Sequence, residues 1–433
     1  MKRWLLSILC FLIAYVSIAQ NHSIIPKPAE MVVGDGMFEV NAQTLISFND
    51  KQQMDVANFL NEFLSKNYQL NLSSKLSKKL KANAIHFNLD NAVHDESYEL
   101  KISRNAVEIK GGAPGLFYGL QSLLQLLPLE QNSSIQLPVL EVKDAPRFKH
   151  RGAMMDSGRY FFPVEDVKRF IDIIAAYKLN VFHWHLTEDA GWRIEIKKYP
   201  LLTEIGAWRS GTQTNHDPNS FDRLPHGGFY TQEELKEVVA YANARNITII
   251  PEIDMPGHTL SILAAYPEVS CTGGPFKVLE QWGIQKDVLC AGNEKTYQMV
   301  ADILDELIAI FPSEIIHIGG DEAPKNRWKA CKLCQEKIKA EELADEEALQ
   351  SYFIKRVADY LYSKGRRILG WDEIMEGGLA PGAIVMSWRG EAGGIQAAQM
   401  QHEVVMVPNH YFYLDYYQSN LNLNLLIFGE MYP

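Results

Sequence analysis

The chain has 433 residues, of which 47% are hydrophobic and 22% are charged. This composition is typical of a soluble globular protein, and the length is typical of two domains. The formal net charge of -11 argues against binding to nucleic acid or to anionic membranes.

Residues 1–19 have the pattern of a secretory signal peptide. A basic start precedes an apolar run from Trp4 to Ile18, and Ser17-Ile18-Ala19 forms a small-x-small cleavage site. The run is shorter than the roughly 20 residues that a membrane span needs, which argues against an anchor. We therefore expect export to the periplasm or the extracellular space, with no membrane span in the mature chain.

Residues 20–145 predict a small α+β domain. Residues 97–102 alternate between polar and apolar side chains as a half-buried strand does, and residues 106–109 continue the pattern. Residues 116–127 have the apolar spacing of a helix. Strands followed by a helix favour an α+β arrangement, and acids, histidines and cysteines are not concentrated here.

Residues 146–433 predict strands that alternate with helices. Such βα units place their strands in parallel, and seven of them indicate a (β/α)8 TIM barrel in the α/β class. The predicted strands are 151–156, 181–186, 247–254, 315–318, 367–371, 383–388 and 404–408. The predicted helices are 164–178, 231–246, 294–311 and 345–364.

An eighth strand is not visible in the sequence. Residues 418–426 are repetitive and fit no βα unit, so we expect the last unit of the barrel to be missing and the C-terminus to be cut short or altered. An open barrel leaves unpaired strand edges. For a chain that ends at Pro433, we expect weak or absent activity and poor stability.

Two adjacent acids, Asp321 and Glu322, follow the fourth strand and the pair Gly319-Gly320. Neighbouring carboxylates repel, so one pKa should rise and leave a proton donor beside an anion. A bare acid pair also fits a loop acid followed by a helix N-cap. The other strand ends favour a functional site, because the carboxyl ends of barrel strands are where active sites form.

Charged and aromatic residues recur at those strand ends. They are Asp156, Arg159, His183, His185, Glu188, Asp189, Trp192, Glu252, Asp254, His258, Trp371, Asp372, Glu373, Trp388, Tyr411, Tyr413 and Asp415. Aromatic faces cover the apolar side of a sugar ring, and carboxylates bind its hydroxyl groups. The pattern therefore favours sugar recognition.

Several motifs in order resemble glycoside hydrolase family 20, the β-N-acetylhexosaminidases. They are His317–Glu322, Arg151–Arg159, Asn180–Thr187, Gly191–Ile196 and Pro251–His258. The resemblance covers most of residues 20–418, including the leading α+β domain. It implies an exo-acting enzyme that removes terminal, non-reducing β-linked GlcNAc or GalNAc from oligosaccharides or glycoconjugates.

The resemblance also implies substrate-assisted catalysis with retention of configuration and no cofactor. The acetamide oxygen of the substrate attacks the anomeric carbon and forms an oxazolinium intermediate. Glu322 is then the general acid, Asp321 holds the acetamide N–H, and His258 stands beside the acid, linked to Glu188. The family usually has Asp at the position of Glu188, so the extra methylene changes this geometry.

The remaining roles that the resemblance implies concern substrate binding. They fall on Arg159 for O3 and O4, Asp254 as a supporting acid, Trp371 and Trp388 as walls of the acetamide pocket, Tyr413 for the acetamide oxygen, and Asp415 for O4 or O6. The family places a further Trp and Glu near the last strand, and the sequence lacks a match for them.

A metal-dependent TIM-barrel hydrolase that uses His183 and His185 is one alternative. It needs further ligands, and only His258 and His317 are candidates, so the ligand count disfavours it. The other alternative is a glycan-binding barrel that has lost catalysis. The presence of the acid pair Asp321 and Glu322 argues against it. Oligomeric state and the choice between GlcNAc and GalNAc stay open.

Four cysteines follow the signal peptide, and export makes disulfides possible. The Cys331-x-x-Cys334 spacing alone is compatible with zinc or redox chemistry. A zinc site would need a second ligand pair at similar spacing, which the chain lacks. We therefore expect a Cys271–Cys290 disulfide, a small Cys331–Cys334 clip, and no metal.

Overall fold

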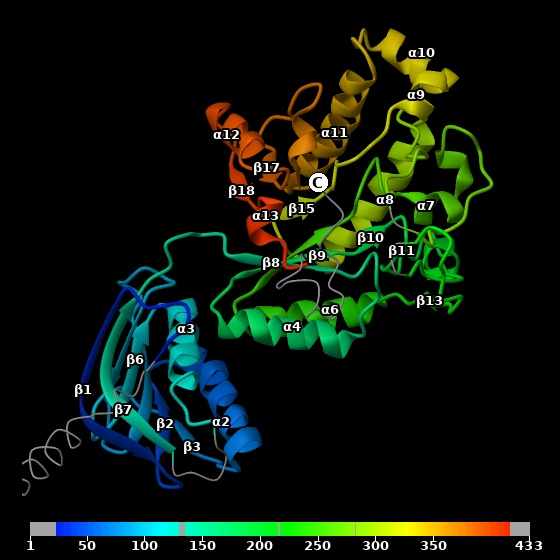
Figure 1. Cartoon of the computed structure of the whole chain (residues 1–433). Helices are drawn as coiled ribbons and strands as arrows, with labels where there is room; N and C mark the ends of the chain where they lie inside the picture. The colour runs from blue at the N-terminus through cyan, green and yellow to red at the C-terminus, as the bar shows by residue number, and fades with distance from the viewer. Residues whose placement is uncertain (1–22, 130–134, 215–216, 282, 416–433) are drawn as a thin grey trace, which may run out of the picture. The chain divides into compact units, whose positions relative to one another are not determined.

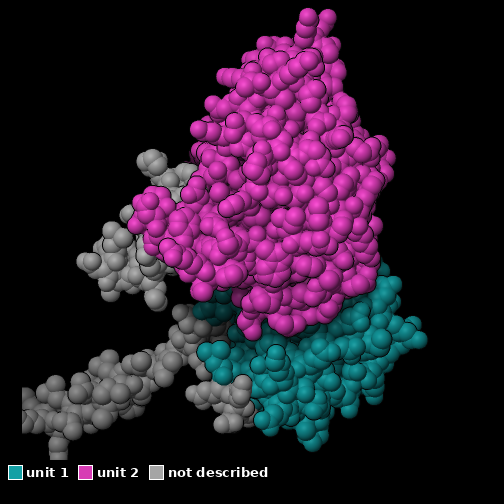
Figure 2. Space-filling view, turned by 90° about the vertical axis from the view of Figure 1, so that its right-hand side faces the viewer, with its two compact units in different colours: residues 1–149, 176–178 teal, residues 150–175, 179–433 magenta. Residues whose placement is uncertain are grey.

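The computed structural model describes residues 23–129, 135–214, 217–281 and 283–415. It forms two compact units, residues 1–149 with 176–178 and residues 150–175 with 179–433, which Figure 2 colours separately. The predicted signal peptide and the repetitive stretch 418–426 lie outside the described residues, and the domain bounds 20–145 and 146–433 stay predictions. Within the described ranges, no helix is long and apolar enough to cross a membrane.

The first unit is a mixed seven-stranded sheet in the order β1-β7-β5-β6-β4-β2-β3. Helices α2 and α3 cover one face of it (Figure 1). Its strands are β1 (Glu30–Val40), β2 (Leu45–Phe48), β3 (Ser73–Leu76), β4 (Ala84–Leu89), β5 (Tyr98–Ile102), β6 (Val107–Gly111) and β7 (Ile135–Asp144), and its helices are η1 (Lys51–Gln53), α2 (Met54–Tyr68) and α3 (Ala113–Leu124). The predicted α+β fold is confirmed. Helix α3 starts earlier than predicted because Pro114 stands in its first turn, where a missing N–H costs nothing.

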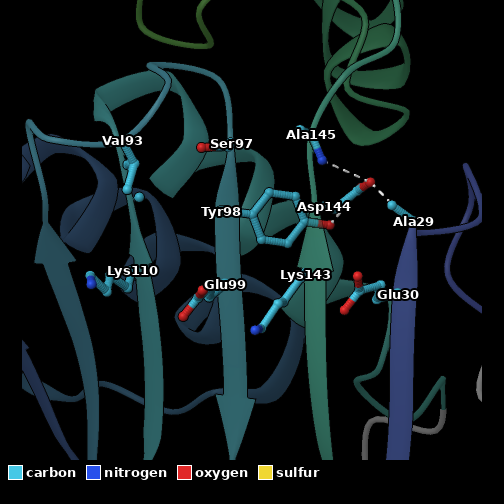
Figure 3. A pocket seen from close by; sticks show the side chains of 11 residues that line it. Ala29, Glu30, Val93, Ser97, Tyr98, Glu99, Lys110, Lys143, Asp144 and Ala145 are labelled. Atoms are coloured by element: carbon cyan, nitrogen blue, oxygen red, sulfur yellow. Dashed lines mark hydrogen bonds between the residues drawn. The ribbon is translucent and has the colours of Figure 1, made fainter.

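A hollow in the first unit is lined by residues from β1, β5, β6 and β7 (Figure 3). Asp144 anchors one side of it, because its Oδ1 accepts hydrogen bonds from the backbone N–H groups of Ala29, at 3.1 Å, and Ala145, at 3.0 Å. Its Oδ2 accepts from the hydroxyl of Tyr98 at 3.1 Å. These hydrogen bonds hold the ends of the neighbouring strands in place. None of the predicted catalytic residues lines this hollow.

The second unit contains seven parallel strands in the order β18-β17-β16-β15-β14-β9-β8. These strands are β8 (Gly152–Asp156), β9 (Val181–His185), β14 (Thr248–Glu252), β15 (Ile315–His317), β16 (Arg367–Trp371), β17 (Ile384–Ser387) and β18 (Val404–Met406). They coincide with the seven predicted strands, with ends shifted by a few residues. The fold class is therefore confirmed as that of a TIM barrel preceded by a smaller domain.

Helices and short segments connect these strands. The helices are α4 (Val164–Ala176), α5 (Leu201–Glu204), α6 (Gln232–Asn243), α7 (Leu260–Ala265), η2 (Pro267–Val269), α8 (Glu294–Ile310), α9 (Asn326–Ala330), α10 (Lys332–Ala340), α11 (Glu346–Ser363), η3 (Asp372–Met375), α12 (Ala392–Gln399) and α13 (Asn409–Phe412). Two hairpins are formed by β10 (Thr187–Glu188) with β11 (Gly191–Trp192) and by β12 (Trp208–Arg209) with β13 (His226–Gly227). Helix α6 begins with a capping box between Thr231 and Glu234, which satisfies two backbone donors at its start. Helices α4 and α6 lie side by side (Figure 1), and an ion pair of 2.6 Å joins Lys168 to Glu237.

The strand register lines up a polar row at the carboxyl ends. Asp156 pairs with His185, His185 with Glu252, and Glu252 with His317. Beneath and beside this row the strands are apolar, with Ile250, Leu369 and Met386 in one buried cluster. The sheet thus holds charged groups level with one another on an apolar base, which fixes their positions.

Candidate active site

The glycine pair after β15 determines where Asp321 and Glu322 lie. Gly319 and Gly320 adopt φ values of +67° and +96°, which favour glycine. A Cβ on Gly319 would lie only 1.8 Å from Oδ1 of Asp254. The chain therefore leaves β15 by pressing its backbone against Asp254. Glu322 itself has φ +44°, a conformation that costs a non-glycine residue about 1–2 kcal/mol.

His258 joins the acid pair to the end of the second barrel strand. Its Nε2 lies 3.3 Å from Oε2 of Glu322 and 3.5 Å from Oδ2 of Asp321. Its Nδ1 lies 2.9 Å from Oε1 of Glu188. Burial alone would lower the pKa of His258, but the carboxylates of Glu188 and Asp321 outweigh it and raise that pKa well above its usual value. The imidazolium therefore lies between two sets of acids.

Asp189 also reaches the imidazole, with Oδ2 at 3.4 Å from Nδ1 of His258. Its other oxygen accepts a 2.8 Å hydrogen bond from the backbone N–H of Leu260. The longer side chain of Glu188 therefore still makes the shorter contact with Nδ1. The dyad that the sequence predicts is formed with Glu188, and Asp189 supports it.

Glu188 also pairs with Arg159, and Asp156 holds the same guanidinium at 2.6 Å. Burial would raise the pKa of Glu188, but Arg159 and His258 lower it to about 2. The pKa of Arg159 is raised, because these carboxylates outweigh the effect of burial. Arg159 is thus fixed in place and charged at the edge of the site.

Asp254 and Asp321 form a close pair of acids. Both carboxylate oxygens of the buried Asp254 lack a hydrogen-bond partner among the described residues. Burial and the neighbouring Asp321 raise the pKa of Asp254 well above its usual value. Burial also raises the pKa of Asp321, to about 6, against the opposing effect of His258. Both acids are therefore harder to ionise than an exposed aspartate, because each carboxylate is buried and repels the other.

Glu252 is fully buried beneath these acids and has three polar side-chain neighbours within 3 Å. His183 Nε2 lies 2.7 Å from its Oε2, and His317 Nδ1 and Trp371 Nε1 each lie 2.9 Å from its Oε1. Glu252 was predicted at a strand end without a role. Its position in the polar row could only be found from the strand register. His183 and His317 could hold a metal with Glu252, but this hydrogen bonding already uses the atoms that would bind it.

Aromatic side chains line the side of the site next to β16 and β17. Trp371 is 5% exposed and Trp388 is 9% exposed, and the ring of Tyr413 stacks on Trp388 with centroids 6.3 Å apart. Trp388 donates a 3.0 Å hydrogen bond from Nε1 to Glu373, and burial followed by the charge of Asp321 raises the pKa of Glu373 to about 7. Glu373 was predicted at a strand end without a role, and its proximity to Asp321 follows from the fold.

Asp415, the last described residue, is exposed and lies in the electric field of Arg159 and Asp156. Burial and the charge of Asp321 raise the pKa of Tyr413, whose ring stacks on Trp388. All ten predicted site residues therefore gather at one end of the parallel strands. Their individual roles stay predictions.

A pocket opens beside this group. Its lining combines predicted residues with others that the sequence analysis did not select: Arg159, Glu188, Asp189, Ala190, Arg209, Thr212, His258, Leu279, Glu280, Gln281, Gly283, Ile284 and Glu322. Arg209 donates from Nη1 to the backbone carbonyl of Arg159 at 2.6 Å. Arg209 lies in the short hairpin strand β12, and Leu279, Glu280 and Gln281 lie outside the helices and strands. None of them follows a barrel strand, so reasoning from barrel strand ends could not select them.

The predicted Cys271–Cys290 disulfide and Cys331–Cys334 clip are wrong, because all four cysteines are free. An S–S bond needs sulfurs about 2.05 Å apart. The fold instead brings the four sulfurs into one cluster, with all four ligand atoms within 4.8 Å of one another. The expectation of no metal rested on sequence spacing, and the fold removes that argument by joining two distant cysteine pairs.

Comparison with known proteins agrees with this arrangement. The sequence profile described as "Glycosyl hydrolase family 20, catalytic domain" matches residues 148–426, and that of domain 2 of the family matches residues 21–145. A β-hexosaminidase of Porphyromonas gingivalis is 46% identical over 421 residues, which cover 95% of this chain and 53% of the relative. One of Vibrio furnissii is 35% identical, over 93% of this chain and 65% of the relative. This chain thus spans between about half and two thirds of these relatives' lengths.

Solved structures resemble it equally well. An exo-β-N-acetylglucosaminidase from Vibrio harveyi, in complex with N-acetylglucosamine, superposes with a TM-score of 0.81 at 33% identity, covering 91% of this chain and 62% of that one. A β-N-acetylhexosaminidase from Bacteroides fragilis gives 0.79 at 32% identity, covering 92% and 78%. The chain belongs to glycosyl hydrolase family 20.

Proposed function

We propose that the protein is an exo-acting β-N-acetylhexosaminidase that removes terminal, non-reducing β-linked GlcNAc or GalNAc from oligosaccharides or glycoconjugates. One observation carries the proposal: His258 contacts Glu188 on one side and both Asp321 and Glu322 on the other. Such an array can hold one acid ionised beside a second that exchanges a proton. The names of the relatives support the same activity.

Glu322 protonates the glycosidic oxygen as the bond to the aglycone breaks. The substrate's acetamide oxygen attacks the anomeric carbon from within the same molecule, so the protein supplies no nucleophile. Asp321 accepts a hydrogen bond from the acetamide N–H, and its negative charge stabilises the oxazolinium intermediate. Water then opens the intermediate with Glu322 as the base, and the configuration is retained.

The surrounding groups bind and orient the sugar. Trp371, Trp388 and Tyr413 enclose the acetamide group, with the Tyr413 hydroxyl donating to its oxygen. Arg159 is held by Asp156 and Glu188, and its remaining donors bind O3 and O4 of the sugar.

Two further acids complete the binding site. Asp254, whose pKa is raised by burial and by Asp321, is the supporting acid beside Asp321. Asp415 binds O4 or O6. A site that surrounds a single terminal sugar in this way favours exo cleavage.

Export is part of the proposal. The basic start, the apolar run and the small-residue cleavage site in residues 1–19 support transport to the periplasm or the extracellular space. Glycans on other cells and in the surroundings are then accessible as substrates. Fractionation of the producing cells tests this: the proposal fails if the intact leader stays on a protein in the cytoplasm.

Purified wild type and Glu322→Gln, assayed on a panel of glycosides, test the activity. Wild type should release the chromophore from a 4-nitrophenyl β-N-acetylglucosaminide and leave the matching β-glucoside intact. Glu322→Gln should lose about 10²–10⁴-fold in rate on substrates with poor leaving groups. Glu391→Gln, at an exposed glutamate far along the chain, is the matched control and should keep full activity.

The same panel separates the alternatives. A glycan-binding barrel without catalysis would bind N-acetylglucosamine and release no chromophore. Equal cleavage of the β-glucoside, or a covalent bond between sugar and a protein carboxylate, would contradict the substrate-assisted mechanism.

A further inference from the structure

Four cysteines from two separate segments meet in the second unit. Cys271 follows the short helix η2, and Cys290 precedes the start of α8, with a bridge between Ser270 and Leu289 closing the segment between them. Cys331 and Cys334 lie at the start of α10. Cys290, Cys331 and Cys334 are buried, and Cys271 is half-buried. The cluster lies outside the group of acids and aromatic residues described above.

Three of the six sulfur–sulfur separations match the edge of a tetrahedral metal site, and all four sulfurs lie within 4.8 Å of one another. Sγ of Cys334 lies 3.8 Å from that of Cys271 and 3.7 Å from that of Cys290, which in turn lies 3.7 Å from that of Cys331. Four sulfurs at about 2.3 Å from a central Zn²⁺ have edges of about 3.8 Å. Cys290 and Cys334 each have two sulfur neighbours at this distance. Two disulfides would instead give each sulfur one partner at about 2.05 Å.

The backbones of the two cysteine segments lie close to each other at Gly292. The N–H of Gly292 donates a hydrogen bond to Sγ of Cys290. A Cβ on Gly292 would lie 2.2 Å from the carbonyl carbon of Leu333 and 2.4 Å from the backbone nitrogen of Cys334. Glycine therefore allows the two cysteine segments to pack backbone against backbone, which brings their sulfurs together.

The surroundings also suit a negative centre. Four thiolates with one Zn²⁺ carry two net negative charges. Cys331 is the residue that precedes helix α10, so the positive end of that helix faces the cluster. Arg327 pairs with Asp287 at 2.7 Å and lies within electrostatic reach of Cys271.

We propose that Cys271, Cys290, Cys331 and Cys334 bind one structural Zn²⁺ ion as four thiolate ligands. All four positions of the tetrahedron are filled by protein, so the ion binds no substrate and stabilises the fold. It ties the segment that follows Cys271 to the start of α10. Leu279, Glu280 and Gln281 of that segment line the pocket beside the acids, so the ion also positions one wall of that pocket.

Metal content and thiol state of the full chain, purified without chelator, test the site. Elemental analysis should find one zinc per chain. After denaturation and removal of the metal, peptide mass spectrometry should find all four cysteines open to alkylation without a reductant. Cobalt-exchanged protein should show the sulfur-to-cobalt charge-transfer bands and the visible bands of a tetrahedral thiolate site.

Cys331→Ser should lose the zinc and the cobalt bands, whereas Lys332→Ala, at the exposed next residue of the same helix, should keep both. Disulfide-linked peptides without metal, free thiols that take up neither ion, or iron in place of zinc would each overturn the proposal. These measurements on wild type decide the matter even if Cys331→Ser does not fold.

A kinetic readout rests on the proposed function. In Cys331→Ser that still folds, KM for the chromogenic substrate should rise more than kcat falls, because the pocket wall loosens while the acids stay in place. Metal content does not depend on activity, so failure of the enzymatic proposal and failure of the zinc proposal are distinguishable.

Discussion

Nδ1 of His258 lies 2.9 Å from Oε1 of Glu188, and this contact orients the imidazole toward the acid pair. With Nδ1 engaged, Nε2 points at Glu322 and Asp321, 3.3 and 3.5 Å away. His258 also has φ +51°, a strained conformation for a side-chain-bearing residue. Backbone and side chain together therefore hold one ring orientation.

Replacing Glu188 should weaken catalysis more than binding. In Glu188→Gln the imidazole loses its nearest negative charge, so the pKa of His258 falls and its hold on the acid pair weakens. We expect kcat to fall at least about 10-fold, on the scale of general acid–base contributions. Glu188→Asp keeps the charge and should retain most of the activity. Steady-state kinetics check both variants, and a kcat of Glu188→Gln equal to wild type would show that the dyad has no catalytic effect.

Activity should rise with pH through about 6. Asp321 must be ionised to hold the acetamide N–H and to stabilise positive charge, and burial raises its pKa to about 6. Below that pH the acid is protonated and the rate is lost, so kcat/KM should fall on the acid side of about 6. The pH profile of kcat/KM measures this for the free enzyme.

A variant of Glu373 is the control for assigning the acid limb to Asp321. Burial and the charge of Asp321 raise the pKa of Glu373 to about 7, so Glu373 titrates in the same pH range. Glu373→Gln should leave an acid limb near 6, since Asp321 remains. Disappearance of the acid limb in Glu373→Gln would show that the limb reports Glu373 and not Asp321. A profile that is flat between pH 5 and 7 in wild type would sink the role given to Asp321.

The contribution of Asp321 to folding stability should fall as pH rises, whereas its contribution to activity should increase. A buried acid whose folded pKa is raised is most stabilising when protonated, so this contribution is present below its ordinary pKa and is lost as pH rises through about 6. Glu188, whose pKa is lowered to about 2, acts in the other direction and at lower pH.

The difference in melting temperature between wild type and Asp321→Asn isolates this effect. As pH rises from 4 to 7, wild type should lose stability relative to the variant, because only wild type then carries the buried charge. Thermal unfolding monitored by circular dichroism at several pH values is the measurement. A constant difference across that range is incompatible with a raised pKa of Asp321.

The sequence predicted the barrel strands well because buried parallel strands are short apolar runs bounded by turns. Strand β18 ends at Met406, earlier than predicted, since Pro408 cannot donate to a ladder. The site was predicted from strand ends, and the register confirms that they meet. The role of Glu252 was missed because it depends on which strands are neighbours in space.

The cysteines show the limit of spacing arguments. A zinc site was expected only if a second ligand pair had the same close spacing as Cys331 and Cys334. Cys271 and Cys290 lie farther apart in the sequence, so they were not counted as such a pair. The fold brings these distant residues together because the segment between them is closed by its own bridge and Gly292 permits backbone contact. Ligand geometry is a property of the fold, and sequence separation does not determine it.

Gly319→Ala should be strongly destabilising, and Gly365→Ala is its matched control. Both glycines have left-handed φ values, +67° and +72°, so each substitution carries the same backbone cost of about 1–2 kcal/mol. The added Cβ meets Asp254 Oδ1 at 1.8 Å in the first case and no atom within 4 Å in the second. Gly319→Ala should therefore lose about 2 kcal/mol or more beyond the control, together with activity, because the shift also moves Asp321 and Glu322. Urea unfolding and a chromogenic assay measure both effects. Equal losses of stability in the two variants would mean that the backbone of Gly319 does not press against Asp254.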